Sequence, residues 1–200
     1  MRVGQIMHKE PYSIHPKKRV GQALKLMQKH NIRHLPVVED DKMVGWITSR
    51  VLREVLLASM LEVITVGDVM VQAPITVTSD TLVEEAARLL YEHKIGGMPV
   101  LDGDRLVGVI TTMDLLAAFL SMLGLLRTSS RLDLLLEDSP AVLEQVSQLI
   151  KGAGGEVINI ALGPIKNKKR SYFFRLKKGD LSPIVAALKN QGYKVLDFIS

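Results

Sequence analysis

The chain has 200 residues, of which 47% are hydrophobic and 24% charged, and these values are typical of a soluble globular protein with one or two domains. It contains no cysteine, which excludes disulfides, thiolate metal sites and cysteine nucleophiles. The formal net charge is +5, and the 12 basic and 7 acidic residues of 127–200 account for the whole excess.

The longest apolar stretch, residues 115–126, is much shorter than the roughly 20 residues that a membrane helix needs. The first residues do not form a basic region followed by an apolar core, which is the pattern of a signal peptide. We therefore expect no contact with a membrane and a cytoplasmic location, which the lack of cysteine also suits.

The sequence contains an internal repeat. Residues 3–52 align with residues 66–115 at a constant offset of 63 and without a gap. Identical residues occupy the matched pairs Met7/Met70, Pro11/Pro74, Ala23/Ala86, Ile32/Ile95, Pro36/Pro99, Val37/Val100, Gly45/Gly108 and Thr48/Thr111. A duplicated unit of this size predicts two similar half-sites related by a pseudo-twofold axis.

Each repeat predicts the same order of elements, β-α-β-β-α. A short extended segment precedes an amphipathic helix whose apolar residues recur every three to four positions, and two strands joined by an acidic turn lead into a second helix. The predicted elements are residues 12–14, 20–30, 35–38, 43–48 and 49–61 in the first repeat, and 75–77, 83–93, 98–101, 106–111 and 112–126 in the second.

A different pattern follows a polar break. Two predicted helices begin with Ser139-Pro140 and Ser182-Pro183, where serine suits the N-cap and proline the first helical position. A predicted hairpin carries the basic cluster 166–170 at its tip, and the full order is βαββαβ, a split-βαβ, ferredoxin-like sandwich. The fold class is therefore α+β, with repeats at 1–64 and 65–126, a linker at 127–130 and a last domain at 131–200.

The segment most specific for chemistry is the end of the second repeat. A strand ends at Thr111, and Asp114 lies in the first turn of the next helix, so a hydroxyl, free amide groups and a carboxylate come together. Such a carboxylate can accept from both hydroxyls of a ribose. The first repeat keeps Thr48 but has Val51 at the aspartate position. Alternatively, Thr111 and Asp114 only cap the helix.

These motifs resemble a known pair of families. The duplicated unit, with Pro36-Val37 and Pro99-Val100 and the ending Gly108–Asp114, resembles a tandem pair of CBS domains (the Bateman module). The βαββαβ order and the turn Asp138-Ser139-Pro140 resemble an ACT domain. The combination is similar to CBS–ACT proteins of the acetoin-utilization protein B type.

The CBS resemblance implies a ligand that contains adenosine, such as AMP, ADP, ATP, S-adenosylmethionine or an NAD-like molecule, bound between the repeats without any obligatory cofactor. It also implies that Thr111 contacts the ribose or phosphate and that Asp114 contacts the ribose hydroxyls. Four further residues would line the same pocket: Ser13, Ile14, Arg33 and His34.

In the other cleft the matching places are taken by Thr48, Thr76, Gly96 and Gly97, with Arg33, His34 and Arg50 within reach of phosphates. Because Val51 replaces the ribose aspartate, we expect this cleft to be empty or to bind a different ligand. Gly96 and Gly97 lack side chains that hold phosphates, which argues against a triphosphate.

Together these features predict a non-enzymatic regulatory sensor that forms a homodimer, acts on a protein target and binds no metal, since its five histidines lack metal-ligand spacing. The apolar residues 115–126 are the expected dimer contact. Ala141 replaces the glycine of the ACT effector turn, so pairing of sheets is expected there rather than amino-acid binding. Two alternatives are a structural oligomerisation protein with degenerate clefts and a nucleic-acid-binding regulator that uses Lys166–Arg170.

Overall fold

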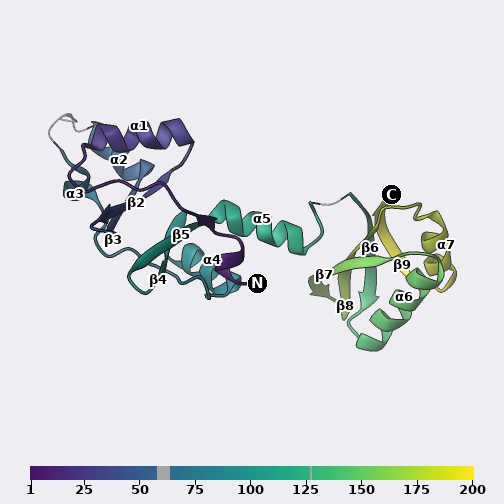
Figure 1. The fold of residues 1–200 in the computed structure, drawn as a ribbon. Helices are drawn as coiled ribbons and strands as arrows, with labels where there is room; N and C mark the ends of the chain where they lie inside the picture. The colour runs from purple at the N-terminus through teal and green to yellow at the C-terminus, as the bar shows by residue number, and fades with distance from the viewer. Residues whose placement is uncertain (58–63, 127) are drawn as a thin grey trace. The chain divides into compact units, whose positions relative to one another are not determined.

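The computed structural model describes residues 1–57, 64–126 and 128–200 (Figure 1). It contains two compact units, Met1–Leu116 and Ala117–Ser200. The division falls inside helix α5 (Thr112–Met122), whereas the sequence suggested a boundary after residue 126.

Each repeat of the first unit has the predicted α-β-β-α elements, but the predicted leading strand is only an extended segment with an isolated bridge. The first repeat contains α1 (Val20–His30), β2 (His34–Glu39), β3 (Lys42–Thr48) and α2 (Ser49–Leu57), and the second contains α4 (Val83–Glu92), β4 (Gly97–Asp102), β5 (Arg105–Thr111) and α5. The short elements η1 (Val3–Gln5), β1 (His8–Lys9) and α3 (Val66–Val69) precede them. The extended segments make isolated parallel bridges, Ile14 to Val37 and Val77 to Val100.

One predicted helix end lies outside the described residues, and another differs from the structure. The end of the predicted helix 49–61 belongs to the first kind, because α2 is described only as far as Leu57. Helix α5 ends at Met122 instead of residue 126, because Gly124 adopts a φ of 70° and the amide of Leu125 turns back to the carbonyl oxygen of Leu120. Glycine in this left-handed conformation ends helices at little steric cost.

The two repeats are interlocked by their leading segments. β1 of the first repeat pairs with β5 of the second, with His8 opposite Val109, while Val71 bridges to Trp46 of the first repeat. These two contacts are equivalent under the offset of 63. The leading segment of each repeat therefore bonds to the hairpin of the other, through the strand β1 in one case and through an isolated bridge at Val71 in the other.

Two pairs of residues that are identical in the two repeats, a glycine pair and a methionine pair, explain this close approach. A methyl group added at Gly108 would lie 2.6 Å from the Met7 sulfur and 2.8 Å from the backbone oxygen of His8. A methyl group at the equivalent Gly45 would contact the side chain of Met70 in the same way. The matched Gly/Gly and Met/Met pairs thus mark the points where one repeat crosses the other.

The core of the first repeat lies between α1 and its hairpin. Val20, Ala23 and Met27 form the predicted buried stripe of α1, and they pack with Leu35 and Ile47, both fully buried. Burial of such side chains stabilises the fold by about 1.5–3 kcal/mol each, before conformational entropy is counted. This core fixes the start of β2, where Arg33 and His34 lie.

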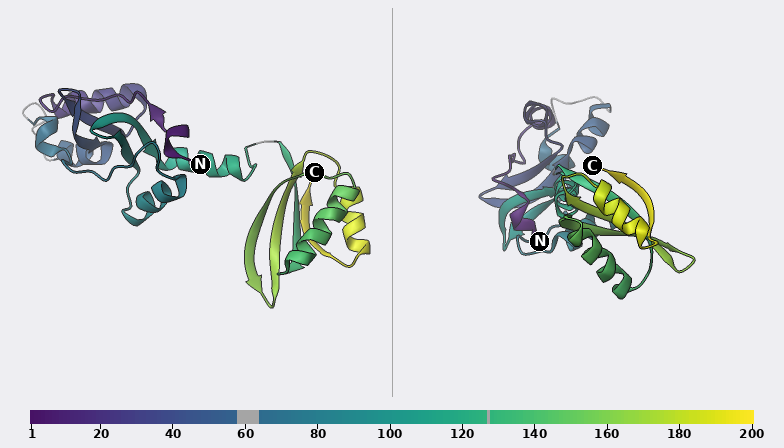
Figure 2. Two further views of the ribbon diagram at one scale, coloured as in Figure 1. Left: turned by 60° about the horizontal axis from the view of Figure 1, so that its bottom comes forward. Right: turned by 90° about the vertical axis from the view of Figure 1, so that its right-hand side faces the viewer.

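The second unit confirms the βαββαβ order. It contains β6 (Ser129–Glu137), α6 (Pro140–Gly152), β7 (Val157–Lys166), β8 (Lys169–Lys177), α7 (Ser182–Asn190) and β9 (Lys194–Ile199). The antiparallel sheet has the order β7-β8-β6-β9, which is the split-βαβ arrangement, and both helices cover one face (Figure 2). Because β6 begins at Ser129, the predicted linker 127–130 is too long; residue 127 lies outside the described residues.

The basic cluster forms the predicted hairpin tip between β7 and β8. The Arg170 side chain donates two hydrogen bonds to Asp138, at 2.8 and 3.1 Å, so part of the positive charge of the cluster is neutralised within the unit.

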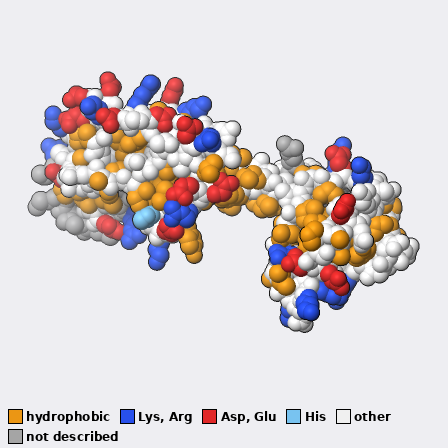
Figure 3. Space-filling view, turned by 90° about the horizontal axis from the view of Figure 1, so that it is seen from below, with side chains coloured by type: hydrophobic (Ala, Val, Ile, Leu, Met, Phe, Trp, Pro, Cys, Tyr) orange, Lys and Arg blue, Asp and Glu red, His pale blue; other side chains and the backbone are white. Residues whose placement is uncertain are grey.

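Figure 3 shows that apolar side chains interrupt the charged surface, and exposed examples in this unit are Ile158, Leu162 and Phe198. Among the helices described, none is both long and apolar enough to span a membrane.

Candidate functional site

Two cavities lie at the interface between the repeats of the first unit. The larger, about 520 Å³, is lined by Arg33, Arg50, Arg53 and Lys94 together with apolar residues, and we call it the basic cleft. The smaller, about 340 Å³, contains Thr111 in its lining, and we call it the Thr111 cleft. Both volumes fall within the range of pockets that hold small molecules.

The two clefts are equivalent under the pseudo-twofold axis. Residues 71, 73–75 and 94–97 of the basic cleft correspond, at the offset of 63, to residues 8, 10–12 and 31–34 of the Thr111 cleft. Trp46, Thr48 and Arg50 likewise correspond to Val109, Thr111 and Met113. Arg33 and His34 line both clefts, which makes them a shared wall.

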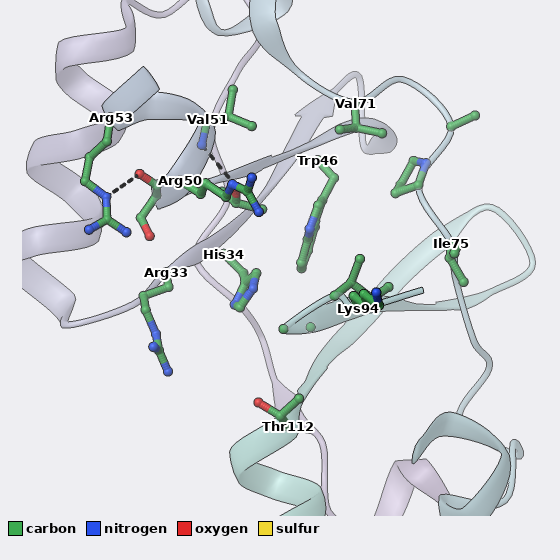
Figure 4. Close-up of a pocket in the computed structure, with 17 residues that line it drawn as sticks. Arg33, His34, Trp46, Arg50, Val51, Arg53, Val71, Ile75, Lys94 and Thr112 are labelled. Atoms are coloured by element: carbon green, nitrogen blue, oxygen red, sulfur yellow. Dashed lines mark hydrogen bonds between the residues drawn. The ribbon is translucent and has the colours of Figure 1, made fainter. Parts of the chain in front are cut away.

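The wall of the basic cleft combines aromatic rings with cations (Figure 4). The His34 ring stacks against Trp46 with a centroid separation of 5.7 Å, and Trp46 is 5% exposed and forms part of the pocket wall. The Arg50 side chain pairs with Glu54 at 3.0 Å, and the Arg53 Nε donates to the carbonyl oxygen of Ser49 at 3.2 Å. No aspartate or glutamate is among the described residues that line this cleft.

His34 is held in place by the glycine pair of the second repeat. A methyl group built at Gly96 or Gly97 would lie 3.1–3.2 Å from the His34 ring, so glycine lets the imidazole pack against the backbone. Burial lowers the pKa of His34 below its usual 6.5, and the Arg33 guanidinium lowers it further. His34 is therefore neutral at pH 7, and the positive charge of the clefts comes from arginine and lysine.

In the Thr111 cleft the structure joins Thr111 and Asp114. Asp114 Oδ2 accepts hydrogen bonds from the Thr111 amide at 2.8 Å and from the Thr111 hydroxyl at 2.6 Å. The His8 imidazole lies 3.0 Å from the other oxygen, Oδ1, and the His8 side chain is 72% exposed. The capping alternative is thus realised for Oδ2, while Oδ1 is contacted only by the exposed His8 side chain.

The structure places the predicted site residues in three groups. Arg33, His34 and Thr111 line the Thr111 cleft, with Asp114 bonded to Thr111, and Thr48, Arg50, Gly96 and Gly97 line the basic cleft. Three predicted residues lie elsewhere. Ile14 is buried in the core of the first repeat, Ser13 faces a separate hollow beside the hairpin turns, and Thr76 is exposed outside both linings.

The linings of the two clefts therefore do not include Ser13, Ile14 and Thr76, for which a ligand contact stays a prediction. In both repeats the cleft uses the residue one position earlier, Tyr12 and Ile75. Successive side chains of an extended segment point in different directions, so an error of one residue moves a side chain out of the site.

Sequence reasoning missed two cations of the basic cleft, Arg53 and Lys94. Lys94 follows α4 with a φ of 53°, and this left-handed turn directs the chain towards the interface. A comparison of charges at the offset of 63 would have found both, since they match Leu116 and Asn31. Within the described residues, no group of three His, Asp or Glu side chains could hold a metal ion.

Comparison with known proteins agrees with this architecture. The family model described as the CBS domain matches residues 3–58 and 66–121, the two repeats found above. The chain belongs to the CBS domain family. A CBS domain-containing protein of Dictyostelium discoideum is 34% identical over 134 residues, which cover 60% of this chain and 92% of that protein.

Other curated relatives are larger enzymes that contain a CBS pair of this kind. The inosine-5'-monophosphate dehydrogenase of Thermoplasma acidophilum is 38% identical over 112 residues, 56% of this chain and 22% of the enzyme. The L-aspartate semialdehyde sulfurtransferase of Methanocaldococcus jannaschii is 34% identical over 119 residues, which cover 58% of this chain and 23% of the enzyme. The chain therefore spans less than a quarter of these two enzymes.

Solved structures of CBS pairs are similar to the first unit. The CBS pair of protein MJ0100, in complex with 5'-methylthioadenosine and S-adenosyl-L-methionine, has 33% identity and a TM-score of 0.55, covering 60% of this chain and 95% of its own. CBSX2 of Arabidopsis thaliana in complex with AMP has 30% identity and a TM-score of 0.55, and the match covers 60% of this chain and 96% of that one. The Vibrio cholerae protein named AcuB for acetoin utilization has 28% identity and a TM-score of 0.57, and the match covers 62% of this chain and 94% of that one.

Proposed function

We propose that this chain is a cytoplasmic, non-enzymatic sensor that binds an adenine nucleotide or another adenosyl compound between its CBS repeats. The observation that carries the proposal is the pair of equivalent cavities at the repeat interface, one of which is lined by Thr111, whose hydroxyl is bonded to Asp114. Related CBS pairs supply support, because they bind 5'-methylthioadenosine, S-adenosyl-L-methionine or AMP.

The proposed binding mode in the Thr111 cleft follows from the geometry of Asp114. Oδ2 stays bonded to Thr111, while Oδ1 exchanges its contact with His8 for a ribose hydroxyl. This exchange costs little, because a contact made by a largely exposed side chain such as His8 contributes about 0–1 kcal/mol. Tyr12 and Met113 provide apolar surface for the adenine ring, and Arg33 at the shared wall is available to a phosphate.

The second unit fits an ACT-type domain in its element order and sheet order. We assign to it, over about 131–200, the pairing of two chains in a homodimer, with residues 115–126 as a further contact between copies. Ligand binding would then favour one dimer geometry over another, and this change would reach a protein target. A ligand can shift such an equilibrium only by its difference in affinity for the two geometries.

Calorimetric titration of the full chain tests the proposal. The panel is AMP, ATP, NAD, S-adenosylmethionine and 5'-methylthioadenosine, and binding of at least one at micromolar to submillimolar concentration is expected. A thermal shift under the same conditions gives an independent readout, since a ligand that binds only the folded state raises the melting temperature. Absence of heat and of thermal shift at millimolar concentration of every ligand contradicts the proposal.

A structural oligomerisation protein is the second candidate, and one observation favours it. The carboxylate of Asp114 already has partners within the chain on both oxygens, as expected for a cleft that has lost its ligand. Under this alternative the ligand panel has no effect, whereas the dimer persists. A nucleic-acid-binding role through Lys166–Arg170 is weaker, because Arg170 is paired with Asp138.

A further inference from the structure

The second unit has a cavity of its own on the open face of its sheet. Leu132 of β6 and Phe174 of β8 belong to the core that the sheet forms with α6 and α7, so the alternate residues of these strands point to the opposite face (Figure 2). A cavity of about 280 Å³ lies there, lined by residues of β6, β7 and β8 and by Leu123 and Leu125 of the turn that follows α5. This volume suits a small ligand, since it lies just below the usual range of about 300–1,000 Å³.

The turn that borders the cavity is held against the sheet. The Asn159 side chain on β7 donates a hydrogen bond to the carbonyl oxygen of Met122 at 2.9 Å. Gly124 is buried with a φ of 70°, and a methyl group built on it would lie 3.3 Å from the Ile158 side chain. The shape of the cavity is therefore built into the fold of this unit, as in most sites for small molecules.

The polar part of the lining is a row of three residues on neighbouring strands. Arg175 on β8 lies opposite Arg131 on one side and opposite Asn159 on the other. Arg131 already has a counterion, because its Nε and a terminal nitrogen donate to Asp133, which is 4% exposed. Arg175 is half-buried, and within the described residues its side chain has no hydrogen bond or ion pair. Its positive charge is thus available to an anion in the cavity.

The remaining lining is apolar. Phe173 and Ala161 form the adjacent cross-strand pair on the same face, and Leu123 and Leu125 add aliphatic surface from the turn. The Arg131 guanidinium carbon lies 5.7 Å from the centroid of the Phe173 ring, a contact that helps to hold the ring in place. Among the described lining residues none is acidic, so the cavity favours an anion over a cation.

We propose that this cavity binds a small monocarboxylate with a compact aliphatic or aromatic body. The planar guanidinium of Arg175 forms a two-pronged pair with the carboxylate, and the second N–H of the Asn159 amide donates beside it. An amino acid fits less well, because Arg131 and Arg175 repel its ammonium group and no carboxylate of the described lining holds it. Residues 138–140, where the ACT resemblance places an effector turn, are not among the described residues of this lining.

Calorimetric titration of the full chain with two matched pairs of compounds tests the proposal. Benzamide keeps the ring of benzoate without its charge, and leucine keeps the skeleton of 4-methyl-2-oxopentanoate but carries an ammonium group. Arg175→Met removes the charge and keeps an apolar stem, while Ala161→Leu fills the cavity. Lys189→Met, at an exposed position of α7 on the other face of the sheet, is the control for net charge. Melting curves without ligand check that each variant is folded.

Wild type is expected to bind benzoate and 4-methyl-2-oxopentanoate at submillimolar concentration, and benzamide and leucine about tenfold more weakly or less. Arg175→Met and Ala161→Leu each weaken both carboxylates about tenfold or more, whereas Lys189→Met binds them as wild type does. The proposal is overturned if neither carboxylate binds at millimolar concentration, if Arg175→Met keeps the wild-type affinity, or if leucine binds more tightly than its oxo counterpart.

Arg50→Met separates this cavity from the basic cleft of the first unit. Loss of benzoate binding in Arg50→Met but not in Arg175→Met would place the anion in the basic cleft and overturn the proposal. An AMP titration of the same proteins reports on the clefts between the repeats. Failure of the carboxylates to bind therefore leaves the proposed function standing, and failure of AMP to bind leaves the carboxylate site standing.

Discussion

Asp114 has two roles, one in the stability of the fold and one in ligand binding, and its replacement by alanine separates them. Within the protein, its carboxylate accepts from the amide and hydroxyl of Thr111 at 2.8 and 2.6 Å, an arrangement comparable with a helix cap. Loss of such a cap costs about 1 kcal/mol, with a range of about 0.5–2 kcal/mol. The exposed His8 contact adds about 0–1 kcal/mol, so the variant should lose about 1–2 kcal/mol of unfolding free energy in urea.

The second role of Asp114 is ligand binding. A hydrogen bond to a charged group contributes about 1.5–3 kcal/mol, so Asp114→Ala should weaken 5'-methylthioadenosine about 10- to 150-fold in a calorimetric titration. This ligand has no phosphate and therefore reports on the Thr111 cleft rather than on the basic cleft.

The chain contains a matched control for this experiment. Asp68 accepts from the amide and hydroxyl of Thr65 at the same distances, 2.8 and 2.6 Å, but lies outside both cleft linings. Asp68→Ala should reduce stability without changing the dissociation constant. Equal loss of affinity in the two variants would show that Asp114 acts only through folding, and the ribose role would then be abandoned.

Three further predictions follow from the interface between the repeats. His8→Ala frees Asp114 Oδ1 and should strengthen 5'-methylthioadenosine binding a few-fold, whereas a weaker complex would mean that His8 contacts the ligand. Gly108→Ala should cost about 1–3 kcal/mol in urea unfolding, more than Gly45→Ala, because the nearest backbone oxygen is 2.8 Å away at 108 and 3.1 Å at 45; the reverse order would refute the crossing geometry. Burial lowers the pKa of His34 in the folded protein, so the unfolded chain takes up this proton at a higher pH than the folded chain does. The free energy of unfolding should therefore decrease as the pH falls below about 6.5. His34→Asn should make this fall shallower between pH 7.5 and 5.5 in thermal unfolding, and an unchanged slope would assign it to other groups.

The elements of the fold could be predicted from the sequence wherever a pattern repeats over many residues. The apolar spacing of Val20, Ala23 and Met27 gave the bounds of α1, because a helix buries residues at that period whatever surrounds it. The end of α5 at Met122 was missed, because the apolar residues continue while Gly124 decides the backbone. A single left-handed residue outweighs a favourable pattern there.

The candidate site was predictable only in part. Thr111 and Asp114 were found because their spacing places them in one turn, and the structure joins them. Ser13 lies outside the cavity linings because the direction of a side chain in a short extended segment is set by tertiary contacts, here the bridge between Ile14 and Val37. Lys94 was missed because its role depends on the pairing of two repeats, which no local pattern of the second repeat encodes.

The central claim is that adenosyl ligands occupy the clefts between the repeats. Native mass spectrometry counts the ligands bound to each chain in the presence of 5'-methylthioadenosine and ATP together. We predict up to two ligands on wild type, loss of the 5'-methylthioadenosine mass in Asp114→Ala, and loss of the ATP mass in the double variant Arg50→Met, Lys94→Asn, which removes two of the cations that line the basic cleft. A wild-type spectrum that shows only the bare polypeptide at millimolar ligand, or ligand masses that persist in all these variants, would contradict it.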